Sequence, residues 1–247
     1  MTKRFEGRVA VVTGASRGIG YFTARALASE GAHVVAVART VGGLEELDDE
    51  IRAAGGQATL VPVDLTDYDA IDRLGAAIHE RWGKLDALIG NAGILGGLSP
   101  LGHISPRVWD KVMAINVTAN WRLIRSLDPL LRQSDAGRVV FLSSGAAHKC
   151  KAYWGPYSVS KAALEALVRT YVAETMQTPI TGMLVNPGPM RTAMRAEAMP
   201  GEDPETLPHP SELAASILDL AAPENQANGK LFDFPSKELR DFIQVSS

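Results

Sequence analysis

Tyr157 and Lys161 are the residues of this chain whose types and spacing point most directly to chemistry. Four positions apart, they share one face of a helix and lie one turn from each other. In that arrangement an ammonium group can stabilise a phenolate, so a phenol with an ordinary pKa of about 10 becomes a usable proton donor or acceptor. The spacing alone is weak evidence, because chance produces such a pair in about one sequence of this length in six.

A glycine-rich segment near the N-terminus, residues 13–20, suggests what this proton transfer accompanies. Glycines let a pyrophosphate approach the backbone, and a helix N-terminus adds free N–H groups and the positive end of a dipole. The spacing is Gly-x-x-x-Gly-x-Gly, which can also be only a tight connection between a strand and a helix. A hydride-carrying dinucleotide beside a proton donor would indicate an oxidoreductase. We predict dinucleotide contacts from Gly14, Ser16, Arg17, Gly18, Ile19 and Gly20.

These residues must be positioned by the strand–helix pattern that runs along the chain. Several short runs are apolar on successive residues, as expected when helices cover both faces of a sheet. The expected strands are Arg8–Thr13, His33–Ala38, Ala58–Val63, Ala87–Gly90, Arg138–Ser143, Ile180–Val185 and one near Leu231–Phe234. The expected helices include Gly18–Glu30, Gly43–Ala54, Tyr68–Arg81, Pro106–Leu131, Tyr157–Thr175 and Ser211–Leu220. The alternation predicts an α/β fold, a three-layer, doubly wound parallel sheet of the Rossmann type with about seven strands.

Residues 1–247 are expected to form a single domain, since no repeat, low-complexity segment or linker divides the chain. The one irregular stretch runs from Pro187 to Pro210 and is rich in proline. A long connection of this kind in a compact domain is either a functional lid or a disordered segment. Its place between a late strand and the last helix favours a substrate lid at residues 187–210.

The end of the second strand bears on which dinucleotide is bound. Doubly wound proteins that select NAD place an acidic residue near this position, whereas an arginine suits the 2′-phosphate of NADP. Here the strand ends at Arg39, no Asp or Glu occurs before Glu45, and Arg17 can add a second cation. A solvated arginine at a strand end is the alternative interpretation. We therefore expect NADP(H) as the preferred cofactor, with NAD(H) as the second choice.

Further cofactor contacts are expected after the third and fourth strands, because open α/β sheets bind ligands at the carboxyl ends of their strands. Asp64, followed by Leu65, can hydrogen-bond an adenine amino group, or it can cap the next helix. Asn91, Ala92 and Gly93 follow the fourth strand, where small residues would let the backbone lie against the cofactor ribose.

Composition argues against several other classes of protein. The formal net charge of −3 gives no broad attraction to nucleic acid or anionic membranes. Cys150 is the only cysteine, so no intrachain disulfide can form. The N-terminal residues lack the apolar core of a signal peptide, and no apolar run reaches the roughly 20 residues that span a bilayer. We expect a cytoplasmic protein without a metal and without a nucleic-acid or membrane partner.

Several motifs occur in a characteristic order. They are Thr13-Gly-x-x-x-Gly-x-Gly, Asn91-Ala-Gly, Asn116, Ser144, Tyr157-x-x-x-Lys161 and Pro187-Gly188. As a set they closely resemble the short-chain dehydrogenase/reductase family in its single-domain form. The resemblance runs from roughly Arg8 to Phe234, nearly the whole chain.

The resemblance implies a role for each catalytic candidate. Tyr157 would be the general acid when a carbonyl is reduced and the general base when an alcohol is oxidised. Lys161 would lower the pKa of this tyrosine and hydrogen-bond the nicotinamide ribose. Ser144 would hold the substrate oxygen, and its thirteen-residue spacing from Tyr157 favours it over Ser143. Asn116 would bend its long helix and anchor a water in a proton relay to Lys161.

The resemblance also implies that Pro187, Gly188 and Thr192 border the nicotinamide and hydrogen-bond its carboxamide. The substrate is expected to meet a partly hydrophobic wall that includes Leu95, Trp154, Met190 and Met194. Further substrate candidates are Gly96, Gly97, Ala146, His148, Lys149, Tyr153 and Met199. Of these, His148 and Lys149 can either receive an anionic group or point to solvent.

The expected activity is interconversion of a small carbonyl compound and a secondary alcohol, with NADP(H) as the hydride carrier. Family members form dimers or tetramers, so a homo-oligomer, in particular a homotetramer, is expected. Ala162, Ala163, Ala166 and Leu167 would allow a partner helix to pack closely, or could pack on their own sheet. The alternatives are an NADP-binding interaction or regulatory module without turnover, an NAD-dependent dehydrogenase, and an enzyme that uses the cofactor internally for epimerisation or dehydration.

Overall fold

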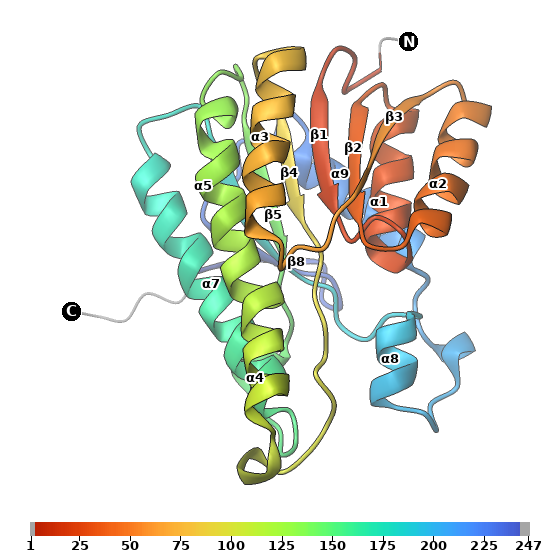
Figure 1. The fold of residues 1–247 in the computed structure, drawn as a ribbon, viewed down its shortest axis with the longest axis vertical. Helices are drawn as coiled ribbons and strands as arrows, with labels where there is room; N and C mark the ends of the chain where they lie inside the picture. Colours follow the sequence, from red (N-terminus) through yellow and green to blue (C-terminus); the bar gives the residue numbers. More distant parts are fainter. Residues whose placement is uncertain (1–2, 243–247) are drawn as a thin grey trace.

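The computed structural model describes residues 3–242, and within them the strands form one eight-stranded sheet (Figure 1). The strands are β1 (Val9–Thr13), β2 (His33–Ala38), β3 (Gln57–Pro62), β4 (Ala87–Gly90), β5 (Arg138–Leu142), β6 (Thr181–Asn186), β7 (Lys230–Asp233) and β8 (Glu238–Asp241). Their order is β3-β2-β1-β4-β5-β6-β7-β8, and only the β7–β8 pair is antiparallel. The chain reverses direction across the sheet between β3 and β4, which makes the β1–β4 boundary the topological switch point.

Helices cover both faces of this sheet, which confirms the prediction of a three-layer, doubly wound α/β fold. The α-helices are α1 (Gly18–Ser29), α2 (Val41–Ala53), α3 (Tyr68–Trp82), α4 (Pro106–Met113), α5 (Ala119–Leu131), α6 (Ala146–Lys149), α7 (Gly155–Thr175), α8 (Ala193–Ala198) and α9 (Pro210–Ala221). Helices α1, α2 and α9 pack on one face, and α3, α5 and α7 pack on the other (Figure 1). Along β1, Ala10 and Val12 face the first group, whereas Val9 and Val11 face the second.

The predicted strands agree with the observed ones to within one residue at each end, but the eighth strand was not predicted. All four side chains of β8 are exposed, so this strand has no apolar pattern that a sequence could display. Lys237 has a φ of +59° and turns the chain from β7 into β8. The sheet therefore ends in a short antiparallel hairpin, in place of the expected parallel edge.

The helix predicted over residues 106–131 is interrupted. Helix α4 ends at Met113, a π-helical turn, η2, spans Ala114–Thr118, and α5 then continues to Leu131. A π turn inserts an extra residue into the helical hydrogen-bond ladder and changes the direction of the helix locally. Asn116 lies in this turn, where the resemblance places a bend.

The proline-rich stretch at residues 187–210 contains regular structure. It holds α8 and a short 3₁₀ turn, η3 (Pro204–Thr206), and another 3₁₀ turn, η1 (Leu101–His103), precedes α4. Figure 1 shows α8 beyond the ends of the strands and apart from the three layers. In the part of the chain that the structure describes, no helix is long and apolar enough to cross a membrane.

Candidate active site

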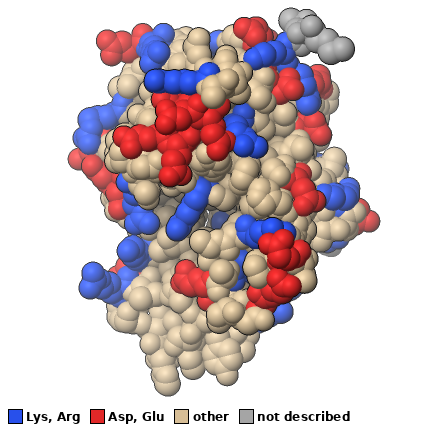
Figure 2. Space-filling view, turned by 90° about the vertical axis from the view of Figure 1, so that its right-hand side faces the viewer, with Lys and Arg blue, Asp and Glu red and all other residues tan. Residues whose placement is uncertain are grey.

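A cleft of about 1360 Å³ opens at the carboxyl ends of the parallel strands and extends under the α8 segment. Figure 2 turns the side that bears α2 and α8 toward the viewer and shows a narrow recess with Lys or Arg side chains beside it. The cleft is lined by every residue predicted to contact the cofactor or to act in catalysis except Gly20 and Asn116. Across residues 3–242, no cluster of three or more His, Cys, Asp or Glu side chains is arranged to hold a metal ion.

The glycine turn between β1 and α1 forms one end of the cleft. Gly14 (φ +67°) and Gly18 (φ +58°) adopt left-handed backbone conformations that other residues rarely take. Arg17 precedes α1 in an extended conformation, makes no side-chain capping hydrogen bond, and is followed by a first turn without an acidic residue. No carboxylate of this turn therefore competes with an anion for the N–H groups at the helix end, so the turn fits a dinucleotide pyrophosphate.

Gly20 lies behind this turn and does not line the cleft, and its predicted contact with the cofactor stays a prediction. A Cβ atom at Gly20 would lie 2.4 Å from the carbonyl oxygen of Gly14 and 2.5 Å from Nδ2 of Asn91. The same Nδ2 donates to the carbonyl oxygen of Thr13 at 2.9 Å. The absence of a side chain at Gly20 therefore lets α1, the turn and the end of β4 pack against one another.

Arg39 and Asp64 face each other farther along the cleft, after β2 and β3. Nη1 of Arg39 lies 3.8 Å from Oδ2 of Asp64, and the two side chains are 52% and 45% exposed. Burial raises the pKa of Asp64, but hydrogen bonds from Thr66 and the charge of Arg39 outweigh it and hold this pKa below its ordinary value. Helix α3 is capped by Asp67, whose side chain accepts from the Ala70 amide at 3.0 Å, so Asp64 is not the helix cap.

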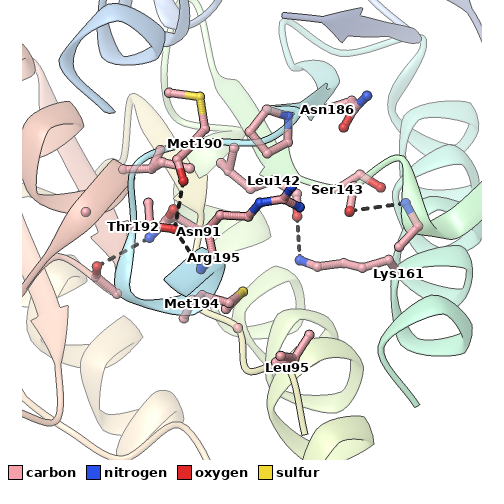
Figure 3. Close-up of a pocket in the computed structure, with 18 of the residues that line it drawn as sticks. Asn91, Leu95, Leu142, Ser143, Lys161, Asn186, Met190, Thr192, Met194 and Arg195 are labelled. Carbon is pink, nitrogen blue, oxygen red and sulfur yellow. Dashed lines mark hydrogen bonds between the residues drawn. The ribbon is translucent and has the colours of Figure 1, made fainter. Parts of the chain in front are cut away.

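Tyr157 and Lys161 on α7 meet Ser144, which follows β5, at the centre of the cleft. Nζ of Lys161 lies 5.7 Å from the centre of the Tyr157 ring and donates to the carbonyl oxygen of Leu142 at 2.7 Å (Figure 3). Burial raises the pKa of Tyr157, and a side-chain hydrogen bond with Ser144 opposes this rise. Burial lowers the pKa of Lys161 to about 8, and the charge of Glu165 opposes this fall.

The expected lowering of the Tyr157 pKa by Lys161 is not what the structure shows. Tyr157 is 8% exposed, and the loss of water around its phenolate outweighs its polar contacts. A phenol with a raised pKa keeps its proton at neutral pH and can give it to a developing alkoxide. Burial therefore favours the protonated form of Tyr157 over a phenolate, and the protonated form is the one that can donate a proton.

The two serines at the end of β5 contact different neighbours. Ser144 lines the cleft, hydrogen-bonds with Tyr157 through its side chain, and accepts from the Ala146 amide at 3.2 Å. Ser143 is 2% exposed, and its hydroxyl donates to Oε1 of Glu165 at 2.5 Å. The serine selected by its spacing from Tyr157 is thus the one that lies beside it.

Asn116 lies behind the cleft, fully buried in the π turn. Its side chain accepts from the Ile94 amide and donates to the Ile94 carbonyl and to Oγ of Ser160, each at 2.9 Å. Its own carbonyl accepts from Nδ2 of Asn120 at 2.8 Å. Asn116 therefore links the segment after β4 to α7. Asn120, which was not predicted from the sequence, hydrogen-bonds to the Asn116 carbonyl in the π turn.

The segment after β6, residues 187–192, closes the cleft on the side of the glycine turn. Thr192 begins α8: its hydroxyl accepts from the Arg195 amide at 3.3 Å and donates to the Met190 carbonyl at 3.4 Å (Figure 3). A Cβ atom at Gly18 would lie 3.5 Å from Cγ2 of Thr192. The start of α8 therefore reaches across the cleft to the turn that precedes α1.

Asn186, at the end of β6, is a further site residue that sequence reasoning missed. Its Oδ1 accepts from the amides of Gly145 and Gly188 at 2.8 and 3.2 Å, and its Nδ2 donates to Asp233 at 2.6 Å. One side chain thus joins the ends of β5, β6 and β7. Its only sequence signal is its place directly before Pro187.

Apolar side chains form the wall of the cleft beside the phenol. Leu95, Tyr157 and Ala198 pack together, with Trp154 and Met194 against them. The rings of Trp154 and Tyr157 meet edge to face, with centroids 6.0 Å apart. This wall is the partly hydrophobic surface expected for the substrate.

Other substrate candidates lie elsewhere. Gly96, Gly97 and Tyr153 do not line the cleft, and Tyr153 is 58% exposed to solvent. Met190 lines the cleft but is 3% exposed, because it packs into the core beneath α1, α2 and α9. Met190 and Met194 carry the same side chain four positions apart, so the sequence could not show that Met190 is the more buried of the two.

Comparison with known proteins gives one consistent result. The model of the short chain dehydrogenase family matches residues 8–203. The chain is 36% identical over 230 residues to the uncharacterized oxidoreductase YciK of Escherichia coli (strain K12), with 92% of this chain and 91% of the relative covered. It is 33% identical to 2,3-dihydro-2,3-dihydroxybenzoate dehydrogenase of Bacillus subtilis (strain 168), with 78% and 74% covered.

Solved structures agree with the sequence relatives. A short chain dehydrogenase from Shigella flexneri 2a complexed with NADP superimposes with a TM-score of 0.90 at 35% identity, covering 94% of this chain and 99% of the other. One from Escherichia coli CFT073 complexed with NADPH gives a TM-score of 0.88 at 35% identity, covering 94% and 98%.

Proposed function

The chain belongs to the short chain dehydrogenase family of oxidoreductases, and on that basis we propose that it interconverts a carbonyl compound and a secondary alcohol with NADP(H). Tyr157 is the proposed general acid and base. The observation that carries the proposal is the meeting of Tyr157, Lys161 and Ser144 in one cleft with the glycine turn. A protein that only binds a dinucleotide needs no such buried proton donor.

In the proposed reduction, Ser144 and Tyr157 hold the carbonyl oxygen, and Tyr157 gives its phenolic proton to that oxygen as negative charge develops there. Bound NADPH would supply the hydride. Lys161 then stabilises the phenolate that remains on Tyr157. In the oxidation direction the same phenolate takes the hydroxyl proton. Because the pKa of Tyr157 is raised, the protonated phenol that the reduction requires is the form present at neutral pH.

Arg39 and Arg17 support NADP(H) as the cofactor. Both arginines line the cleft, and the Arg39 side chain is about half exposed after the end of β2. Two of the solved relatives were complexed with NADP and NADPH. Asp64 lies beside Arg39, so binding of NAD(H) through this carboxylate is the second possibility that a cofactor titration must test.

The substrate class that fits the wall of Leu95, Trp154 and Met194 is a small, partly hydrophobic aldehyde or ketone. We propose that residues 187–210 act as a substrate lid. The packing of Ala198 of α8 against Leu95 and Tyr157 supports this role. We also propose that the protein is a cytoplasmic homo-oligomer, either a dimer or a tetramer. It is supported by the exposed Ala162 and Ala166 on α7.

The test is the loss of NADPH absorbance in the presence of a panel of aldehydes and ketones, repeated with NADH. We expect turnover of at least one partly hydrophobic carbonyl, with a higher kcat/KM for NADPH than for NADH. Tight NADPH binding with no turnover across a broad panel would instead support a binding or regulatory module.

A further inference from the structure

A buried carboxylate lies one turn beyond the proposed catalytic lysine. Glu165 follows Lys161 by four positions on α7, and the two residues are 8% and 4% exposed. Burying a carboxylate is costly unless it is paired and hydrogen-bonded, so its partners indicate what it does. The reaction proposed above assigns no role to Glu165.

Ser143 and His148 contact the carboxylate of Glu165 through their side chains. Oε1 accepts from the hydroxyl of Ser143 at 2.5 Å, and Oε2 lies 3.0 Å from Nε2 of His148 on α6. The His148 side chain is 46% exposed, whereas the Glu165 side chain is 10% exposed, so the imidazole lies on the solvent side of the carboxylate. Arg169, one further turn along α7, also lines the cleft near this group.

These three side chains do not form a nucleophilic triad. In such a triad the hydroxyl donates to the histidine, and the carboxylate orients the histidine from its other side. Here the hydroxyl of Ser143 donates to the carboxylate, and His148 lies on the opposite side of that carboxylate. The hydroxyl of Ser143, which is 2% exposed, donates to a carboxylate, and a carboxylate is a weaker base than the imidazole of a triad. The arrangement holds Ser143 and does not activate it.

Ser143 occupies a central place in the site, between two residues that contact the catalytic pair. Leu142, before it, accepts the hydrogen bond from Nζ of Lys161 (Figure 3). Ser144, after it, hydrogen-bonds with Tyr157. Fixing the side chain of Ser143 therefore fixes the backbone that presents both contacts. A shift of the end of β5 would move the partners of Lys161 and Tyr157 together.

We propose that Glu165 is a positioning residue of the Tyr157–Lys161 centre. It anchors the end of β5 through Ser143 and places a negative charge one turn from the ammonium of Lys161. This inference rests on the proposed function and adds to it the carboxylate that favours the charged form of the lysine. His148 covers the carboxylate on its solvent side.

The electrostatics of the site agree with this geometry. Burial lowers the pKa of Lys161 to about 8, and the charge of Glu165 acts in the opposite direction. The titratable groups around this ammonium include Tyr157 and Glu165 on the same helix. His148 contacts the carboxylate, and Arg169 follows Glu165 by one turn of α7 and lines the same cleft. Without the carboxylate, the ammonium of Lys161 would lose this compensation for burial and keep its hydrogen bond to the Leu142 carbonyl.

The direct test is an NMR titration of the Lys161 13Cε resonance in labelled protein, assigned with a Lys161→Met variant. Glu165→Gln keeps a hydrogen-bond acceptor for Ser143 but removes the charge. We expect this variant to lower the pKa of Lys161 by roughly 0.5 or more relative to the wild type, because a charge one turn away in a poorly solvated site interacts strongly. Glu174→Gln, the matched control, removes an exposed carboxylate farther along α7 and is expected to leave the pKa of Lys161 near its wild-type value.

An unchanged Lys161 titration in Glu165→Gln would overturn the charge role. If that variant does not fold, as judged by circular dichroism, Glu165→Ala provides the same comparison with a second uncharged side chain. The anchoring role is tested by kcat in Ser143→Ala, which is expected to fall at least fivefold with little change in the Kd for NADPH; an unchanged kcat would contradict it. Because the titration needs no substrate, a shifted Lys161 in a protein without turnover would refute the proposed reaction and not this inference.

Discussion

The ammonium nitrogen of Lys161 lies 5.7 Å from the centre of the Tyr157 ring, with both side chains buried on α7. Burial acts against charge on both groups, since it raises the pKa of Tyr157 and lowers that of Lys161 to about 8. At neutral pH the pair is therefore a phenol that keeps its proton beside an ammonium that still carries its charge. This is the state required to protonate a carbonyl oxygen.

The pH dependence of reduction follows from these shifts. The Lys161 ammonium is present below pH 8 and is lost as the pH rises through about 8, while the raised pKa of Tyr157 keeps the phenol protonated over that range. We expect kcat/KM for a carbonyl substrate to be level near neutral pH and to fall above about pH 8. Circular dichroism at each pH controls for unfolding. A rate that stays level to about pH 10 would contradict a catalytic role for this ammonium.

Arg39 is expected to set the preference for NADP(H). Arg39→Ala should raise the Kd for NADPH about 10- to 100-fold, because a hydrogen bond to a charged group contributes about 1.5–3 kcal/mol. The Kd for NADH should change little. Arg52→Ala, which removes a 71% exposed arginine of α2 outside the cleft, is the matched control. Isothermal titration calorimetry with both cofactors measures the change. An equal loss of affinity for NADPH and NADH in Arg39→Ala would argue against recognition of a 2′-phosphate.

A side chain at Gly20 should disrupt the glycine turn. The Cβ atom of Gly20→Ala would lie 2.4 Å from the Gly14 carbonyl oxygen, so we expect destabilisation of about 1–3 kcal/mol and weaker NADPH binding. Gly42→Ala is the matched control, because nothing lies within 4 Å of a Cβ at Gly42 in α2. That variant should be neutral or stabilised by about 0.5–1 kcal/mol. Equal melting temperatures for the two variants would refute the close packing at Gly20.

Asn116 is expected to matter for stability as well as for catalysis. Asn116→Ala removes the side-chain partner of the Ile94 amide and carbonyl, at a cost of about 2–4 kcal/mol in the free energy of unfolding. It also removes one hydrogen bond to the hydroxyl of Ser160, which still donates to the Tyr157 carbonyl. Ser160→Ala removes one of these links and should cost less. Chemical denaturation measures both variants. A loss below about 1 kcal/mol in Asn116→Ala would show that this network does not support the site.

The architecture was predictable because both faces of the sheet are covered. Strands such as β1 are apolar on successive residues, and this pattern marks them in the sequence as strongly as any turn signal. All four side chains of strand β8 are exposed, and the strand is held in the sheet by its pairing with β7. No local sequence pattern therefore predicts it. The π turn η2 was likewise visible only as an expected bend, since its hydrogen-bond shift depends on packing.

The candidate site was predictable where backbone chemistry restricts the residue type, and less so where packing decides. Gly14 and Gly18 have positive φ angles, which a glycine pattern signals directly. Gly20 belongs to the same pattern but faces Gly14 and Asn91, a distinction that only the three-dimensional fold makes. Asn186 and Glu165 carry no motif, because their roles consist of contacts with residues distant in the sequence.

The central claim is that Tyr157 donates the proton in NADPH-dependent reduction, and Tyr157→Phe tests it most directly. The measurement is kcat for the best carbonyl substrate, together with the Kd for NADPH, in this variant and in Tyr153→Phe, an exposed tyrosine outside the cleft. We predict that Tyr157→Phe loses about 10²- to 10⁴-fold in kcat with NADPH binding largely intact, and that Tyr153→Phe keeps the wild-type rate. Full activity in Tyr157→Phe would contradict the account.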